Sequence, residues 1–132
     1  MDDNTVLVLA DPADPQLAIL ADLPEKTGIA VGNSPEAFAR AAPDASVIFN
    51  WSGSGKLLRE VLAMAPKVRW VHSRSAGLDN LLFPELVESP VPLTNGTGVF
   101  SPSLGEFALA AILYFAKDFR RMIRNQMAGR WE

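Results

Sequence analysis

The chain has 132 residues, of which 48% are hydrophobic and 20% are charged, and its formal net charge is −3. This length and composition suit one globular domain with a hydrophobic core and exclude a disordered tail. With no cysteine and a single histidine, His72, the chain has no means to form disulfides, thiolate nucleophiles, cysteine-ligated metal centres or a histidine-rich metal site.

The N-terminal sequence gives no targeting signal. The first four residues carry no positive charge, and the apolar run that follows ends at Ala10, which is too short for a secretory signal. No apolar stretch reaches the roughly 20 residues that span a bilayer; the best, residues 107–116, is about half that length. The sequence therefore predicts a cytoplasmic protein with no membrane role.

Short apolar segments alternate with helical ones along the first hundred residues. The apolar runs are continuous, which is typical of parallel strands covered on both faces. We expect an α/β fold, a flavodoxin-like open parallel five-stranded sheet with helices on both faces, and ligands at the carboxyl ends of the strands. The expected strands are 5–9, 28–31, 46–50, 68–72 and 91–94, and the expected helices are 15–22, 35–41, 55–65 and 78–87.

A long C-terminal helix is predicted from residue 102 or 103 to about 127, because the only glycine in this stretch is Gly105 and no proline interrupts it. Residues 107–115 are apolar on all sides, which indicates burial on several sides. We therefore divide the chain into a flavodoxin-like domain, 1–101, and a long interdomain helix, 102–132. We expect a second domain or another copy of the chain to cover this helix.

Two glycine-containing loops follow an expected strand and precede an expected helix, as nucleotide-binding loops do, but the spacing of their glycines does not match a nucleotide-binding motif. Residues 50–56 lack the first glycine of a phosphate loop, and Leu57 stands where Ser or Thr is needed after Lys56, so a turn capped by Ser54 is favoured. Residues 95–101 have Ser101 where a dinucleotide fingerprint needs glycine. A glycine-rich loop beside a ligand stays open for this second segment.

The loop from Ser73 to Asp79 is the strongest candidate for ligand binding. It follows the fourth expected strand, where Ser75, Ala76 and Gly77 expose successive backbone N–H groups and Arg74 adds positive charge. The loop is therefore suited to a carboxylate or phosphate. The alternative is that Asp79 caps the next helix and the glycine only makes the turn. A structural role is favoured for His72, because no acidic residue is placed to orient it as a base.

Three segments together resemble the N-terminal, substrate-binding domain of the D-isomer-specific 2-hydroxyacid dehydrogenases, the glyoxylate/hydroxypyruvate reductase group. Their order is more specific than any one of them, and the match covers about half the chain well. They are residues 68–80, similar to the family's strand and loop ending in a small residue, glycine, an apolar residue and aspartate; residues 91–95, similar to the next strand; and residues 98–107, with Glu106, similar to the start of the interdomain helix.

The resemblance implies that the backbone amides of Ala76 and Gly77 bind the substrate carboxylate, next to Arg74 and Ser75 of the same loop. It also implies that Trp51 and Phe100 line the substrate pocket. The family's catalytic arginine, glutamate and histidine and its cofactor fingerprint come later than any matching position, so neither Glu106 nor His72 takes a catalytic role.

In the complete enzyme the implied reaction is hydride transfer between NAD or NADP and a small 2-keto or 2-hydroxy acid, such as glyoxylate or hydroxypyruvate. The sequence stops about where a cofactor domain would begin. We therefore expect this chain alone to bind no cofactor, to be inactive, and to form a homodimer through residues 103–131. The alternative is a non-catalytic flavodoxin-like binding or regulatory module that pairs through its long helix. No nucleic-acid partner is expected, since few aromatic residues lie among the C-terminal arginines.

Overall fold

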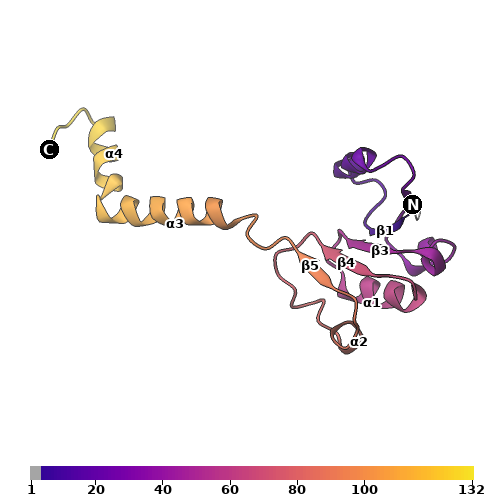
Figure 1. Ribbon diagram of the computed structural model, residues 1–132. Coiled ribbons are helices and arrows are strands. Elements are labelled where there is room, and N and C mark those ends of the chain that lie inside the picture. The colour runs from indigo at the N-terminus through magenta and orange to yellow at the C-terminus, as the bar shows by residue number, and fades with distance from the viewer. Residues whose placement is uncertain (1–3) are drawn as a thin grey trace. The chain divides into compact units, whose positions relative to one another are not determined.

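The computed structural model describes residues 4–132. These divide into two compact units, one that ends at Thr97 and one from Gly98 to Glu132. The first unit holds the sheet and the second holds two helices, which are orange and yellow in Figure 1. Each unit is described by itself.

The first unit is built on one five-stranded sheet in the order β2-β1-β3-β4-β5, with every pairing parallel. This confirms the predicted open parallel sheet, and the order is the flavodoxin-like one. The chain changes direction between β1 and β3, so the carboxyl ends of these neighbours flank the place where such sheets bind ligands. The strands are β1 (Thr5–Leu9), β2 (Gly28–Gly32), β3 (Val47–Asn50), β4 (Trp70–Ser73) and β5 (Leu93–Asn95).

Two of the four predicted connecting helices are shorter than expected, whereas the predicted helix 15–22 is observed with the same bounds, as a 3₁₀ helix, and the predicted helix 55–65 ends one residue earlier. The expected helix 78–87 is reduced to its last turn, because Pro84 forces the preceding residue, Phe83, into an extended conformation. The expected helix 35–41 ends at the fully buried Phe38, after which a second short turn returns the chain to β3. The observed elements are the 3₁₀ helices η1 (Pro15–Asp22), η2 (Pro35–Phe38) and η3 (Ala42–Asp44) and the α-helices α1 (Gly55–Met64) and α2 (Pro84–Val87).

Helix α1 begins where the sequence predicts. The Ser54 hydroxyl accepts a hydrogen bond from the backbone N–H of Leu57 at 3.2 Å, which is the expected N-cap. The helix then buries Leu57, Leu58 and Val61 against the sheet. Since α1 directly follows β3, this cap fixes the helix start at the carboxyl edge of the sheet.

We expect Ser54→Ala to lower the free energy of unfolding by about 1 kcal/mol, because the Leu57 amide loses its acceptor. Urea unfolding followed by circular dichroism measures the change. Ser54→Asp is the control, since its carboxylate keeps an acceptor at the cap and is expected to retain the stability. Equal losses in both variants would contradict a capping role.

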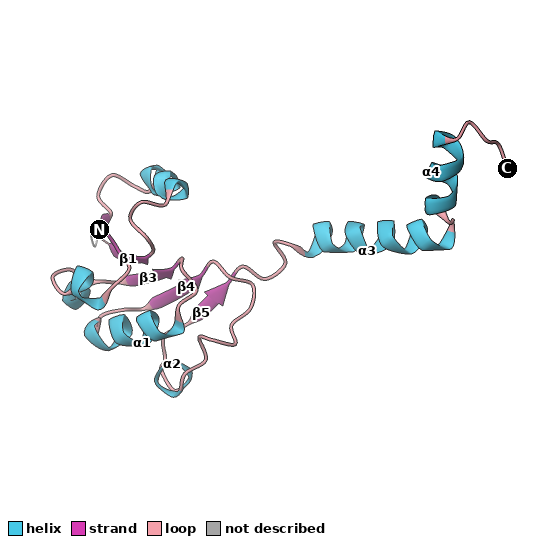
Figure 2. Cartoon of the chain, turned by 180° about the vertical axis from the view of Figure 1, so that it is seen from behind, coloured by secondary structure: helices cyan, strands magenta, loops and turns pink. Residues whose placement is uncertain are grey.

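The two faces of the sheet are covered unequally. Figure 2 shows η1 on one side and α1 and α2 on the other. The α1 side holds the main core, in which Leu7, Leu9, Ile48 and Val71 are completely buried. The η1 side keeps a cavity of about 660 Å³ with a mostly apolar lining. Its walls are Asn4, Val6, Ile19, Leu20, Leu23, Pro24, Thr27, Val47, Phe49, Arg69, Trp70 and His72.

The second unit corrects the predicted long helix. Instead of one helix over 102–127, the chain forms α3 (Ser101–Ala116) and α4 (Phe119–Met127), which run in different directions in Figures 1 and 2. The break is at Asp118, whose φ of 51° is left-handed and whose carboxylate accepts from the N–H of Arg121 at 3.4 Å, capping α4. Aspartate is among the few residues that tolerate this backbone conformation, so the helix ends here without a glycine.

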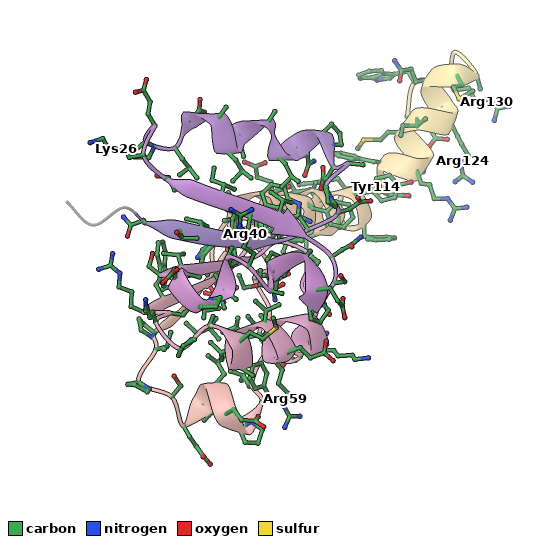
Figure 3. All side chains as sticks on the ribbon, turned by 90° about the vertical axis from the view of Figure 1, so that its right-hand side faces the viewer. Lys26, Arg40, Arg59, Tyr114, Arg124 and Arg130 are labelled. Carbon is green, nitrogen blue, oxygen red and sulfur yellow. The ribbon has the colours of Figure 1, made fainter. Side chains whose placement is uncertain are left out.

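Both helices of the second unit expose large side chains. Phe107 is 75% exposed and Phe115 is 78% exposed, and no residue of α3 is buried within the described chain. Figure 3 shows Arg124 of α4 and Arg130, which follows the helix, projecting outward. Among the described residues, no helix combines the length and the apolar character needed to cross a membrane.

Candidate functional site

The candidate loop that follows β4 is fixed to the strands on both sides of it. On the β3 side, the Arg74 backbone N–H donates to the carbonyl of Asn50 at 3.2 Å. Within the loop, the N–H of Ser75 donates to the hydroxyl of Ser73, a fully buried residue, at 3.2 Å. These two bonds settle the direction in which the chain leaves the sheet.

On the β5 side, the loop is tied through its carbonyl groups. The Gly96 N–H donates to the carbonyl of Ser75 at 3.1 Å, and the Asn95 side-chain amide donates to the carbonyl of Ala76 at 2.7 Å. A Cβ added to Gly96 would stand 2.6 Å from the Arg74 carbonyl oxygen, so glycine is needed there for close packing. Packing alone therefore explains why Gly96, one glycine of the 95–101 segment, is a glycine, and no ligand is needed to explain it.

The backbone N–H groups of Ala76 and Gly77, unlike the carbonyl groups of the same loop, have no hydrogen-bond partner among the described residues. Both residues are exposed. The structure therefore presents two successive unpaired donors on an anchored loop at the carboxyl edge of the sheet, an arrangement that suits an anion.

A small cavity of about 200 Å³ borders Gly77, between the segment that starts α1 and the segment after the loop. Its walls are Gly53, Ser75, Gly77, Asp79, Asn80 and Leu81. Residue Asp79 brings a negative charge to this rim, because a Cβ built on Gly77 would lie 3.4 Å from its Oδ2. The alternative role predicted for this residue, capping a helix at 78–87, falls away because that segment is not helical before Pro84.

Trp51 and Arg74 meet at the same edge, on the side of β1. The guanidinium of Arg74 lies over the Trp51 ring at 4.4 Å from its centroid and donates to the Gln16 side-chain oxygen at 3.1 Å. The indole N–H of Trp51 donates to Asp14 Oδ2 at 2.8 Å. The pKa of Asp14 is lowered by the backbone N–H of Gln16, then by the indole and the Arg74 charge, with desolvation opposing.

Phe100 belongs to the second unit, directly before α3, where it is 59% exposed. His72 has a hydrogen-bond partner, as a structural histidine should: its Nδ1 lies 2.8 Å from the Thr94 hydroxyl. Over residues 4–132 there is no cluster of three or more metal-binding side chains.

Four contributors to the site were not predicted from the sequence: Asp14, Gln16, Asn50 and Asn95. Asn50 is completely buried, and its Nδ2 has no partner among the described residues, while its Oδ1 accepts from the Ser52 hydroxyl at 3.4 Å. Asn50 and Asn95 are the last residues of β3 and β5, so a polar residue at a strand's carboxyl end was the available signal for them. Asp14 and Gln16 lie at the start of η1, where no such signal exists.

The fold and the loop together define a flavodoxin-like α/β unit with backbone amides offered to an anion at its ligand edge. A sequence model of the D-isomer specific 2-hydroxyacid dehydrogenase family, catalytic domain, matches residues 6–129. The chain belongs to this family, whose members are NAD(P)-dependent oxidoreductases.

Among curated proteins, the chain is 30% identical over 74 residues to an erythronate-4-phosphate dehydrogenase of Shewanella baltica; the match covers 56% of this chain and 20% of that protein. Among solved structures, a D-isomer specific 2-hydroxyacid dehydrogenase family protein from Klebsiella pneumoniae matches with a TM-score of 0.59 and 27% identity, over 100% of this chain and 40% of that one. A dehydrogenase of the same description from Xanthobacter autotrophicus, in complex with NADPH and MES, matches with a TM-score of 0.55 and 19% identity, over 99% and 41%.

The chain thus spans about a fifth of the length of the curated relatives and about two fifths of the solved ones. The match to the Xanthobacter structure shows the fold alone, given its low identity.

Proposed function

We propose that this chain is the substrate-binding part of an NAD(P)-dependent oxidoreductase that acts on the CH–OH group of 2-hydroxy acids and reduces 2-keto acids such as glyoxylate or hydroxypyruvate. The pair of unpaired amides at Ala76 and Gly77 supports this most, because two adjacent N–H donors match the two oxygens of a carboxylate. The Shewanella relatives, named for the hydroxy acid erythronate 4-phosphate, support the same class of substrate.

In this proposal the amides hold the carboxylate and Ser75 and Trp51 border it, and Phe100 has the pocket-lining role that the family resemblance implies. The anchored carbonyls of Ser75 and Ala76 keep the donors in place before the substrate arrives, which lowers the entropy lost on binding. The loop therefore orients the keto group but supplies no acid or base itself.

The residues of this chain do not fit a nicotinamide dinucleotide. Neither glycine pair, 53 and 55 or 96 and 98, has the third glycine of the fingerprint, and the space above Gly96 is filled by the Arg74 carbonyl. Hydride transfer is the chemistry of the cofactor, which the complete enzyme would hold with other residues. We expect no cofactor binding by these 132 residues alone.

Two measurements test the proposal. In amide NMR spectra of the chain, titration with oxalate, an analogue of a 2-keto acid, is expected to shift the Ala76 and Gly77 signals more than any others. Mixed with NADH and glyoxylate or hydroxypyruvate, the pure chain is expected to leave the NADH absorbance unchanged. If the loop amides do not shift at saturating oxalate, they do not bind the carboxylate. If the pure chain oxidises NADH with these substrates, the proposal that cofactor binding needs residues outside this chain is wrong.

The proposal also includes a homodimer through residues 103–131. Leaving α3 uncovered exposes several large apolar side chains, each worth about 1.5 to 3 kcal/mol when fully buried. We expect light scattering to give twice the chain mass of 14.3 kDa at micromolar concentration, and Phe107→Ser with Phe115→Ser to return the monomer. A monomer in the unmodified chain would disprove this contact. The alternative, a non-catalytic module pairing through this helix, predicts the dimer without the oxalate shifts.

Asp79→Asn is expected to tighten oxalate binding by about fivefold, because it removes a negative charge near the amides that is worth about 1 kcal/mol at a separation of about 4 Å in water. The gain should shrink as salt is added, since screening weakens the repulsion. Glu88→Gln, an exposed carboxylate beyond α2, is the matched control and should change nothing. The same gain in both variants would show only a general charge effect.

A further inference from the structure

The strongest unassigned feature is the group of side chains around Arg74. It is assembled from three adjacent strand ends: Asp14 and Gln16 come after β1, Trp51 comes after β3, and Arg74 comes after β4. Carboxyl ends of parallel strands meet at one edge of the sheet, so the group lies on the edge that also carries the Ala76 and Gly77 amides.

The contacts hold the guanidinium in place without neutralising it. It lies over the Trp51 ring, and the Gln16 side-chain oxygen accepts from one of its N–H donors. No carboxylate lies within 4 Å of it in the part of the chain that the structure describes, although arginines 59 and 121 do have such partners. Of the five donors of a guanidinium, the remaining ones are available to a ligand.

The nearby acid is engaged elsewhere. The Asp14 carboxylate accepts from the Gln16 backbone at 2.9 Å and from the Trp51 indole at 2.8 Å, so it orients the ring on which Arg74 lies. The positive charge of Arg74 is the weakest of the causes that lower the pKa of Asp14. The Arg74 guanidinium thus lies over the Trp51 ring, and a hydrogen bond to Asp14 holds that ring in place.

This cation and the amide pair are close along the chain. Consecutive Cα atoms are 3.8 Å apart, so the Cα atoms of Arg74 and Gly77 are separated by at most about 11 Å. One loop therefore carries two different anion-binding elements: the amide pair, and a planar fork that suits a carboxylate or phosphate.

We propose that Arg74 is a specificity-determining residue that binds a second anionic group of the substrate, so that the site takes 2-hydroxy or 2-keto acids with a carboxylate or phosphate at the far end. This rests on the proposed function, because the first carboxylate is the one held by Ala76 and Gly77. Asp14 and Gln16 are positioning residues, which act through Trp51 and Arg74.

The test compares three hydroxy acids on the 132-residue chain by NMR titration. D-Lactate has one anionic group, D-malate adds a carboxylate at the far carbon, and D-glycerate 3-phosphate adds a phosphate. We expect the two doubly anionic acids to bind at least about tenfold more tightly than D-lactate, as one extra charge-assisted hydrogen bond would give. Which of the two binds better identifies the second group.

Two variants assign the effect to Arg74. Arg74→Gln is expected to remove the tenfold advantage and to leave D-lactate within twofold, whereas Arg74→Lys keeps the charge and retains part of it. The matched control is Arg69→Gln, which removes one positive charge just before the start of the same strand, β4, and should leave all three affinities unchanged. Asp14→Asn should keep most of the advantage, because its single amide oxygen can still accept from Trp51, although its NH2 group then no longer accepts from the Gln16 N–H. Asp14→Ala removes both acceptors and should lose more of it.

The outcomes separate the two proposals. If D-lactate binds through the loop amides but the doubly anionic acids bind no more tightly, or if Arg74→Gln weakens all three acids alike, the role of Arg74 is overturned and the proposed function stands. If none of the three acids shifts the Ala76 and Gly77 amides, both fail. Equal losses in Arg74→Gln and Arg69→Gln would show a general charge effect and would also overturn it.

Discussion

Replacement of Gly77 by proline is expected to weaken oxalate binding by at least tenfold. Proline has no backbone N–H, so the site loses one of its two donors, and a hydrogen bond to a charged group contributes about 1.5 to 3 kcal/mol. The new ring also restricts Ala76, the residue before it, which carries the other donor. NMR titration of the remaining loop signals, or calorimetry, measures the loss.

Gly77→Ala is the matched control. It keeps the N–H, and its Cβ would be in ordinary contact with Asp79 Oδ2 at 3.4 Å, with no positive φ to strain it. Binding should therefore stay within a few-fold of the unmodified chain. If alanine were as harmful as proline, the glycine would matter for space or shape and the missing donor would not be the cause.

Replacement of Gly55 by alanine is expected to destabilise the first unit by about 1 to 3 kcal/mol, the usual cost of overpacking. A Cβ at this first residue of α1 would overlap the backbone carbonyl of Asn80, and a backbone atom has little freedom to move away. For a unit of this size the melting temperature should fall by roughly 4 to 8 °C for each kcal/mol. The same change should disturb the small cavity at Gly53, Ser75 and Gly77, since Asn80 also lines it.

Gly105→Ala provides the opposite case. Nothing lies within 4 Å of the position where its Cβ would be, and the residue is inside α3, where alanine is favoured over glycine by about 1 kcal/mol. It should raise helix content and leave the melting of the sheet unit unchanged. If Gly55→Ala proved neutral or stabilising as well, the close approach of α1 to Asn80 would be wrong.

The sequence was sufficient for the parallel sheet and for the start of α1. Continuous apolar runs such as the one that ends at Leu9 are local signals carried by neighbouring residues, and Ser54 before Gly55 is a local cap. The same kind of signal failed at Asp118, where the pattern continues through a position that the backbone turns into a helix break. Composition does not reveal a left-handed aspartate.

The candidate loop was located from the sequence, since Arg74 to Gly77 follow a strand in an order that resembles a known family. The hydrogen-bond and ring partners of the loop's polar groups were decided only by the tertiary structure. The carbonyl of Ala76 is occupied by Asn95, which is 19 residues away, and Arg74 is held over a ring that comes from another strand end. Such pairings depend on strand order, because contacts across a sheet join residues that no local pattern relates.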